Sequence, residues 1–84
     1  MSKRLQTILE EIGLTRREAR VYLAVLAQQE ATLADVAKRT LIPRMSCYSI
    51  LHGLLQKGYI DVLVKKKRRF FVTVHPSKIS ARLE

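Results

Sequence analysis

Apolar residues recur through the first part of the chain with the spacing of an amphipathic helix. The first such stripe falls at i, i+3, i+4 and i+7 and consists of Leu5, Ile8, Leu9 and Ile12. This spacing places all four on one helical face. Ser2 is suited to cap the start of this helix, and Gly13 is suited to end it in a left-handed conformation.

Two capping boxes predict the next two helices. A box pairs a threonine with an acidic residue three positions later, and the pairs are Thr15 with Glu18 and Thr32 with Asp35. The first box predicts a helix over about residues 16–28. Apolar residues cover so much of the surface of this helix that we expect it at the centre of the core. The second predicts a short helix over about residues 33–39, which must pack on its neighbours to be stable.

A fourth helix follows the short turn at residues 40–42. Pro43 suits the first helical position because it has no amide hydrogen to leave unpaired, and Gly58 suits the end. At about 100° per residue, one face of this helix is apolar. That face comprises Cys47, Ile50, Leu51 and Leu54, with Leu55 at its margin.

Two runs of β-branched and aromatic residues, 59–64 and 70–74, predict an antiparallel hairpin with the basic run 65–69 at its turn. Residues 77–84 read as the start of a last helix, with Ile79 and Leu83 at i and i+4. The order predicts one domain over residues 1–84, mainly α with a small β-hairpin (α+β). Four helices, a hairpin and a helical stub describe a winged helix-turn-helix.

The chain is strongly basic, with 16 Lys and Arg against 7 Asp and Glu, a formal net charge of +9. Residues 57–84 hold eight basic and two acidic residues, so most of the excess lies around the hairpin. Such an excess usually has an anionic partner. Nucleic acid fits better than an anionic membrane surface, because no basic amphipathic helix with bulky aromatic residues is present.

Catalysis finds little support, and we expect no enzyme, no cofactor and no metal. His52 and His75 lie far apart without ligand partners at metal spacing, and no glycine-rich phosphate loop occurs. Cys47 is the only cysteine, which excludes an intrachain disulfide, and its apolar stripe favours a core position over a redox role. Without a signal peptide or membrane-spanning segment, we expect a cytoplasmic, nucleoid-associated protein without a membrane or an identifiable small-molecule ligand.

The pattern predicts two contacts with double-stranded DNA: a recognition helix, 43–57, in the major groove and a basic wing, 65–69, on the backbone or in the minor groove. The amide-rich helix start at Thr32, and Arg16 and Arg17, are possible further phosphate contacts. The predicted DNA-binding residues are Thr32, Pro43, Arg44, Met45, Ser46, Tyr48, Ser49, His52, Lys65, Lys66, Lys67, Arg68 and Arg69.

Simpler roles exist for several of these residues. Tyr48 is equally suited to pack at the edge of the core, Met45 to be an ordinary surface residue, and Arg16 and Arg17 to be plain surface charges. Charge runs are usually solvated loop tips. The outward face of the fourth helix is poor in long polar side chains, which predicts that affinity depends more on phosphates than on bases.

The sequence resembles the DNA-binding domain of TrmB-type transcriptional regulators, which are frequent in archaea. The resemblance runs from about Leu9 to Pro76 and is carried by the combination GLT..EARVYLA with IPR...Y.IL..L..KG. It implies a winged-helix domain, usually dimeric on operator DNA, with Pro43 to Ser49 at the start of the recognition helix and 65–69 as the wing. Leu41 departs from the family, which often has glycine in this turn.

Members of this family usually continue into a coiled coil and a sugar-binding domain, so the chain is either part of a longer regulator or a domain without a sensor. We expect a transcriptional regulator domain that forms a homodimer through the apolar residues of the first and last helices. Two alternatives remain: a winged-helix protein-interaction module with an acidic partner, and a sequence-indifferent coat on DNA or chromatin.

Overall fold

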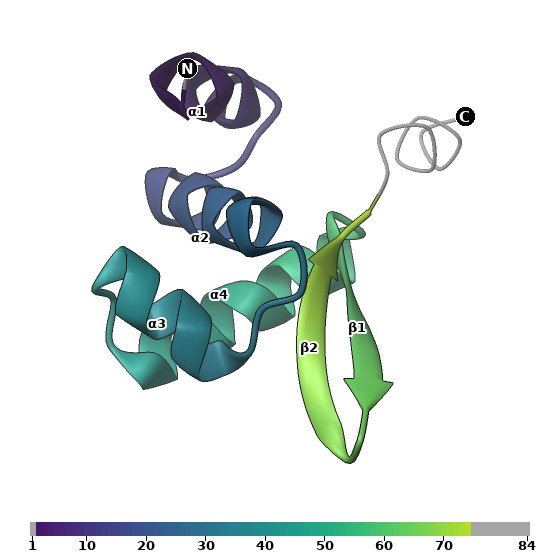
Figure 1. Ribbon diagram of the computed structural model, residues 1–84. Helices are drawn as coiled ribbons and strands as arrows, with labels where there is room; N and C mark the ends of the chain where they lie inside the picture. The colour runs from purple at the N-terminus through teal and green to yellow at the C-terminus, as the bar shows by residue number, and fades with distance from the viewer. Residues whose placement is uncertain (1, 75–84) are drawn as a thin grey trace.

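The computed structural model describes residues 2–74, with side chains from Arg4 onward. Within that range four helices precede one β-hairpin (Figure 1). The elements are α1 (Ser2–Glu11), α2 (Arg16–Gln28), α3 (Leu33–Thr40), α4 (Arg44–Lys57), β1 (Ile60–Lys65) and β2 (Arg68–Thr73). The expected last helix, with Ile79 and Leu83, lies outside the described residues.

The helix α1 is shorter than its apolar pattern predicts. It ends at Glu11, so Ile12 lies in the turn after it, and Ser2 is its first residue rather than its cap. Gly13 has a φ of 112°, as expected of a residue that ends a helix with a positive φ. The stripe also divides: Leu9 is buried, whereas Ile8 is 49% exposed.

The helix α2 is the centre of the core, as its pattern predicts. The Thr15 hydroxyl accepts from the Glu18 amide at 3.1 Å, and the Glu18 carboxylate accepts from the Thr15 amide at 2.9 Å, which completes the capping box. Five of its residues are buried: Ala19, Val21, Tyr22, Ala24 and Val25. Leu26, on the same helix, is 40% exposed.

The turn between α3 and α4 is organised by one buried hydroxyl. Thr40 Oγ1 donates to the Val36 carbonyl at 2.7 Å and accepts from the Ile42 amide at 3.3 Å. Leu41 adopts the left-handed conformation, with φ 61° and ψ 23°, and is 87% exposed. The backbone therefore takes the turn that glycine would ease, and the leucine side chain projects into solvent.

The helix α4 is held by its apolar face. Cys47, Leu51 and Leu54 are completely buried, whereas Ile50 and Leu55 are only partly buried and pack against the core. Pro43 is the N-cap rather than the first helical residue, one position earlier than predicted, and makes no side-chain cap bond. Gly58 ends the helix with a φ of 84°.

The hairpin pairs β1 with β2 in antiparallel register, from Ile60 opposite Thr73 to Lys65 opposite Arg68. Its turn contains only Lys66 and Lys67, so the expected five-residue basic turn is wrong. Both have a positive φ, 49° and 65°, as in the tight turns that match the twist of a hairpin. Lys65, Arg68 and Arg69 are therefore strand residues, and the face on which each side chain lies follows from the alternation along its strand.

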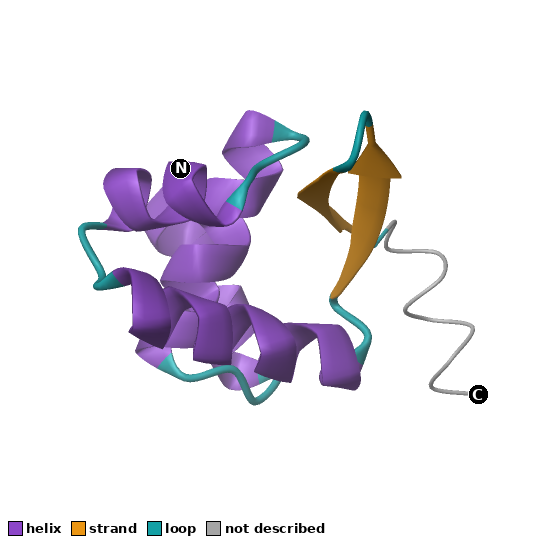
Figure 2. Ribbon diagram, turned by 90° about the horizontal axis from the view of Figure 1, so that it is seen from below, coloured by secondary structure: helices purple, strands orange, loops and turns teal. Residues whose placement is uncertain are grey.

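A backbone bridge joins the hairpin to the helices. The Ala31 amide donates to the Phe71 carbonyl at 3.0 Å, and the Phe71 amide donates to the Ala31 carbonyl at 2.7 Å. The segment between α2 and α3 thus pairs with the free edge of β2. Figure 1 shows the hairpin extending beyond the helices, with its turn pointing away from α1, and Figure 2 shows the hairpin to one side of the helices.

Candidate nucleic-acid interface

The exposed face of α4 contains the residues predicted to read DNA. Arg44, Met45, Tyr48, Ser49 and His52 are exposed, and Ser46 is half-buried. The rings of Tyr48 and His52 stack with their centroids 6.4 Å apart and their planes at 29°. Because Tyr48 is 49% exposed, its ring faces solvent rather than being enclosed in the core.

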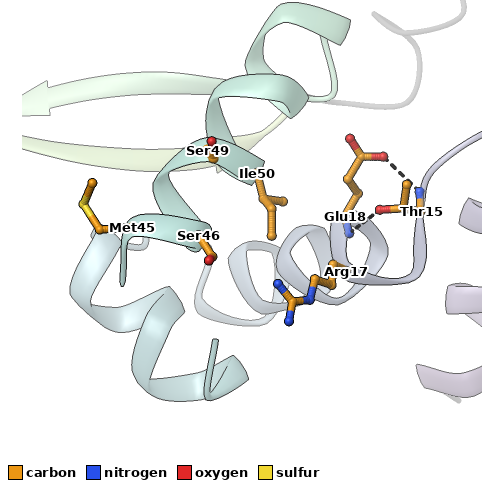
Figure 3. A pocket seen from close by; sticks show the side chains of 7 residues that line it. All are labelled: Thr15, Arg17, Glu18, Met45, Ser46, Ser49 and Ile50. Carbon is orange, nitrogen blue, oxygen red and sulfur yellow. Dashed lines mark hydrogen bonds between the residues drawn. The ribbon is translucent and has the colours of Figure 1, made fainter. Parts of the chain in front are cut away.

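An open groove of about 620 Å³ separates the start of α4 from the start of α2. It is lined by Thr15, Arg17, Glu18, Met45, Ser46, Ser49 and Ile50 (Figure 3). Figure 3 shows Met45 at the end of the groove farthest from Thr15 and Glu18. One exposed cation from α2, Arg17, therefore shares a surface depression with the hydroxyls of Ser46 and Ser49 on α4.

The two arginines at the start of α2 differ in position. Arg17 lines the groove beside α4, whereas Arg16 lines a separate hollow with Gln6, Thr7 and Glu10 of α1. The sequence treats the pair alike, as two phosphate contacts or two plain surface charges, and does not distinguish Arg17 from Arg16. The capping box contained the missing signal, because it fixes where the helix begins and therefore which way each of its first residues points.

The strand register places the basic residues of the hairpin on two different faces. Alternation directs Val64, Arg69 and Phe71 to one face and Lys65, Arg68 and Phe70 to the other. On the first face, a small apolar hollow of about 60 Å³ joins the hairpin to α4. Its lining residues are Tyr48, His52, Leu55, Val62, Arg69 and Phe71.

The basic residues of the opposite face already have partners within the domain. Lys65 Nζ lies 2.9 Å from the Glu30 carboxylate, and the Arg68 guanidinium lies over the Phe70 ring at 5.9 Å from its centroid. Lys66 and Lys67 occupy the exposed turn. The predicted wing is therefore not one uniform patch: Arg69 shares a hollow with the recognition helix, and Lys66 and Lys67 form the tip.

Thr32, predicted to help bind a phosphate at a helix start, is engaged in its own cap. Its hydroxyl accepts from the Asp35 amide at 3.1 Å, and its amide donates to the Asp35 carboxylate at 3.0 Å. The Asp35 carboxylate also adds negative charge to the start of α3. A phosphate contact by Thr32 stays a prediction, and its hydroxyl would have to keep the cap while making it.

An ion pair fixes the far end of α4 against α2. Lys57 Nζ donates to both carboxylate oxygens of Glu18, at 3.1 and 3.0 Å. Burial alone raises the pKa of Glu18, but the Thr15 hydrogen bonds and the Lys57 ammonium outweigh it and lower the pKa below its ordinary value of 4.5. The carboxylate is therefore ionised at neutral pH and ties the end of α4 to α2.

Between residues 2 and 74, no three His, Cys, Asp or Glu side chains gather into a set that would bind a metal ion. No helix in the same range has the length and apolar character needed to span a bilayer.

Known proteins similar to this chain include transcriptional regulators, a chromatin protein and an uncharacterized protein. Residues 9–77 match the family TrmB, described as sugar-specific transcriptional regulators. The sugar-sensing regulator TrmBL1 of Pyrococcus furiosus is 31% identical over 75 residues, 89% of this chain, and YrhO of Bacillus subtilis is 34% identical over 64 residues, 76% of this chain. The chain spans 22% of the length of each of these two relatives.

Solved structures agree with this result. TrmBL2, an archaeal chromatin protein with a novel mode of DNA binding, superimposes with a TM-score of 0.81 at 28% identity, over 98% of this chain and 32% of that one. A MarR-family regulator from Silicibacter pomeroyi superimposes with a TM-score of 0.75 at 17% identity, over 98% of this chain and 56% of that one, which supports the fold alone. The fold is the winged helix-turn-helix that the sequence predicts, and the chain belongs to the TrmB family of transcriptional regulators.

Proposed function

We propose that this domain binds double-stranded DNA as the DNA-binding part of a transcriptional regulator, with α4 in the major groove. The observation that carries the proposal is the shared hollow of Tyr48, His52 and Arg69, which places the exposed face of α4 beside a cation of the hairpin. A helix of about 10–12 Å diameter fits the major groove, and the hairpin would then meet the flanking backbone or minor groove. TrmB-family membership supports the same conclusion.

A titration of the domain with a fluorescent random duplex at two salt concentrations tests this proposal. We expect binding at low salt that weakens steeply as salt rises, because cations that contact phosphates release counterions. Absence of binding at low salt would contradict the proposal and favour a protein-interaction module with an acidic partner. Single-stranded DNA of the same length serves as the comparison ligand.

A second candidate function is a coat on DNA that ignores sequence. Two observations favour it: the reading face of α4 has few long polar side chains, and TrmBL2, 28% identical, is a chromatin protein. Selection of preferred duplexes from a random pool, followed by footprinting, separates the two functions. An enriched sequence with a protected footprint supports a specific regulator, whereas equal affinity for all duplexes supports a coat. Either function would place the protein in the cytoplasm, on the nucleoid.

We also propose that the domain acts as a homodimer through the side that carries α1. An open apolar hollow of about 530 Å³ lies there, lined by Leu5, Ile8, Leu9, Tyr22, Leu26, Thr73 and Val74. It lies on the side away from the hairpin turn, so two copies could pair there and leave both hairpins free (Figure 1). A monomeric mass in sedimentation at micromolar concentration would contradict this proposal. A dimer predicts half-sites about one helical turn apart.

A further inference from the structure

The first turns of α4 present an apolar surface where a DNA-reading helix normally presents hydrogen-bonding groups. Met45 is 83% exposed, and Tyr48, three residues later, lies on the same face. The polar neighbours Ser46 and Ser49 are short, and Arg44 is the only cationic residue in 44–49, so the longer polar groups there are its guanidinium and the Tyr48 hydroxyl. The surface offered to base edges here is therefore a thioether and an aromatic ring.

The chemistry of the major groove restricts what such a surface can accept. Thymine is the one standard base that presents a methyl group there, at C5, whereas cytosine has only a hydrogen atom at C5, beside its amine donor. An apolar side chain against that amine removes its water without providing an acceptor, which costs free energy. Against a thymine methyl group, the same side chain buries apolar surface on both partners.

We infer that Met45, with the ring of Tyr48 beside it, reads the C5-methyl group of thymine, so that an A·T pair lies opposite Met45 in the preferred duplex. This inference rests on the proposed function. The stacking of Tyr48 on His52 orients the ring, and the unbranched Met45 side chain adapts to the methyl group. Met45 is thereby a specificity-determining residue, and Arg44 is left to contact a guanine edge or a phosphate.

Thymine-to-uracil substitution tests the inference directly, because it removes one methyl group and leaves every hydrogen-bonding group in place. The probe is a fluorescent duplex selected from a random pool, with each thymine in turn replaced by uracil. We expect one position at which the replacement weakens binding about fourfold, the factor for one buried methyl group. If every uracil duplex binds as tightly as the parent duplex, the inference is wrong while DNA binding still holds.

A methylated cytosine presents the same C5-methyl group, so a second set of duplexes distinguishes the two sources. Cytosine and 5-methylcytosine are placed at the sensitive position. We expect the methylated base to bind more tightly than cytosine, and thymine to bind at least as tightly as the methylated base. A site that binds 5-methylcytosine more tightly than thymine would overturn the assignment to thymine.

Variants of the protein connect the effect to Met45. Met45→Ala is expected to bind the thymine and uracil duplexes equally, whereas Met45→Leu keeps the difference because it stays apolar. Gln56→Ala is the matched control: it truncates an exposed side chain of similar length in the last turn of the same helix and should keep the full difference. Retention of the fourfold difference in Met45→Ala would overturn the inference. Failure of the unmodified protein to bind any duplex would instead contradict the proposed function.

Discussion

The helix α4 and the β1–β2 hairpin differ in what positions them and in what they offer to DNA. Three completely buried side chains, Cys47, Leu51 and Leu54, hold α4, and its exposed face carries few charges. The hairpin buries Ile60 and Phe71 in the same core but also depends on backbone pairing with itself and with Ala31, and it carries five consecutive basic residues. If the domain binds DNA as proposed, we expect discrimination between sequences to depend on the helix and most of the electrostatic affinity to depend on the hairpin.

Leu51→Ala should have the largest effect, because it opens a cavity beneath the recognition helix. A buried leucine truncated to alanine typically costs about 2–5 kcal/mol of the free energy of unfolding. Urea denaturation followed by circular dichroism measures the loss. Met45→Ala, on the exposed face of the same helix, is the control and should change the free energy by less than about 0.5 kcal/mol. Similar small losses in both variants would show that packing does not position α4.

Removal of three basic residues from the hairpin should weaken binding to every duplex alike. With Lys66, Lys67 and Arg69 all changed to alanine, the slope of log K against log salt should fall by up to about 3, one unit for each lost phosphate contact. Lys65→Ala is the control, because its ammonium already pairs with Glu30. It should change the slope by less than one unit. A loss confined to the preferred sequence would assign base reading to the hairpin instead.

Arg44→Ala tests the helix half of the comparison. If Arg44 reads a base, its loss should cost about 1–3 kcal/mol of binding free energy on the preferred duplex and much less on a random duplex. Anisotropy titrations with the two duplexes measure the difference. Arg4→Ala removes the same charge from an exposed position on α1. Equal losses on both duplexes would make Arg44 a phosphate contact.

Glu18→Gln sharpens the comparison through the ion pair at the end of α4. Glutamine keeps the capping box but loses the charge pair with Lys57, so the free energy of unfolding should fall by about 1 kcal/mol at neutral pH. Because the folded-state pKa of Glu18 lies below its ordinary value, this contribution is present above about pH 4.5 and is lost as pH falls through the folded-state pKa. Urea denaturation at neutral and acid pH should therefore show the difference from the unaltered protein shrinking in acid.

The corresponding pair on the hairpin, Lys65 with Glu30, provides the control for that measurement. Both of its side chains are more exposed, 53% and 42%, than Glu18 at 14%. Solvent screening should limit the effect of Glu30→Gln to less than about 0.5 kcal/mol. A larger effect for Glu30→Gln than for Glu18→Gln would mean that the hairpin depends on its charges for its position.

Features set by neighbouring residues could be predicted from the sequence. Both capping boxes and the bounds of α2 follow from local hydrogen bonding and apolar spacing, and the structure confirms them. The end of α1 could not be predicted, because the apolar stripe continues to Ile12 after the helix has stopped. The turn of the hairpin was also missed, since Lys66 and Lys67 are not the glycine or asparagine that usually marks such a turn.

Within the candidate site, sequence reasoning identified the exposed face of α4 but not how its surroundings are arranged. The position of the turn sets the strand register, and the register decides which hairpin cations lie on which face. Five consecutive basic residues do not indicate which two of them form the turn. The Glu30–Lys65 and Glu18–Lys57 pairs join residues 35 and 39 positions apart, which no local pattern reveals. Whether the predicted residues contact DNA stays a prediction.

The bridge between Ala31 and Phe71 has a mechanical consequence. Because these two hydrogen bonds join the edge of the hairpin to the segment that leads into α3, the hairpin cannot swing away from the helices unless both bonds break. The domain would therefore meet its target with the hairpin and the helices already at a fixed distance from each other. In hydrogen exchange, the Ala31 and Phe71 amides should be protected together. A target that does not fit the spacing between the hairpin and the helices should have to deform in order to bind.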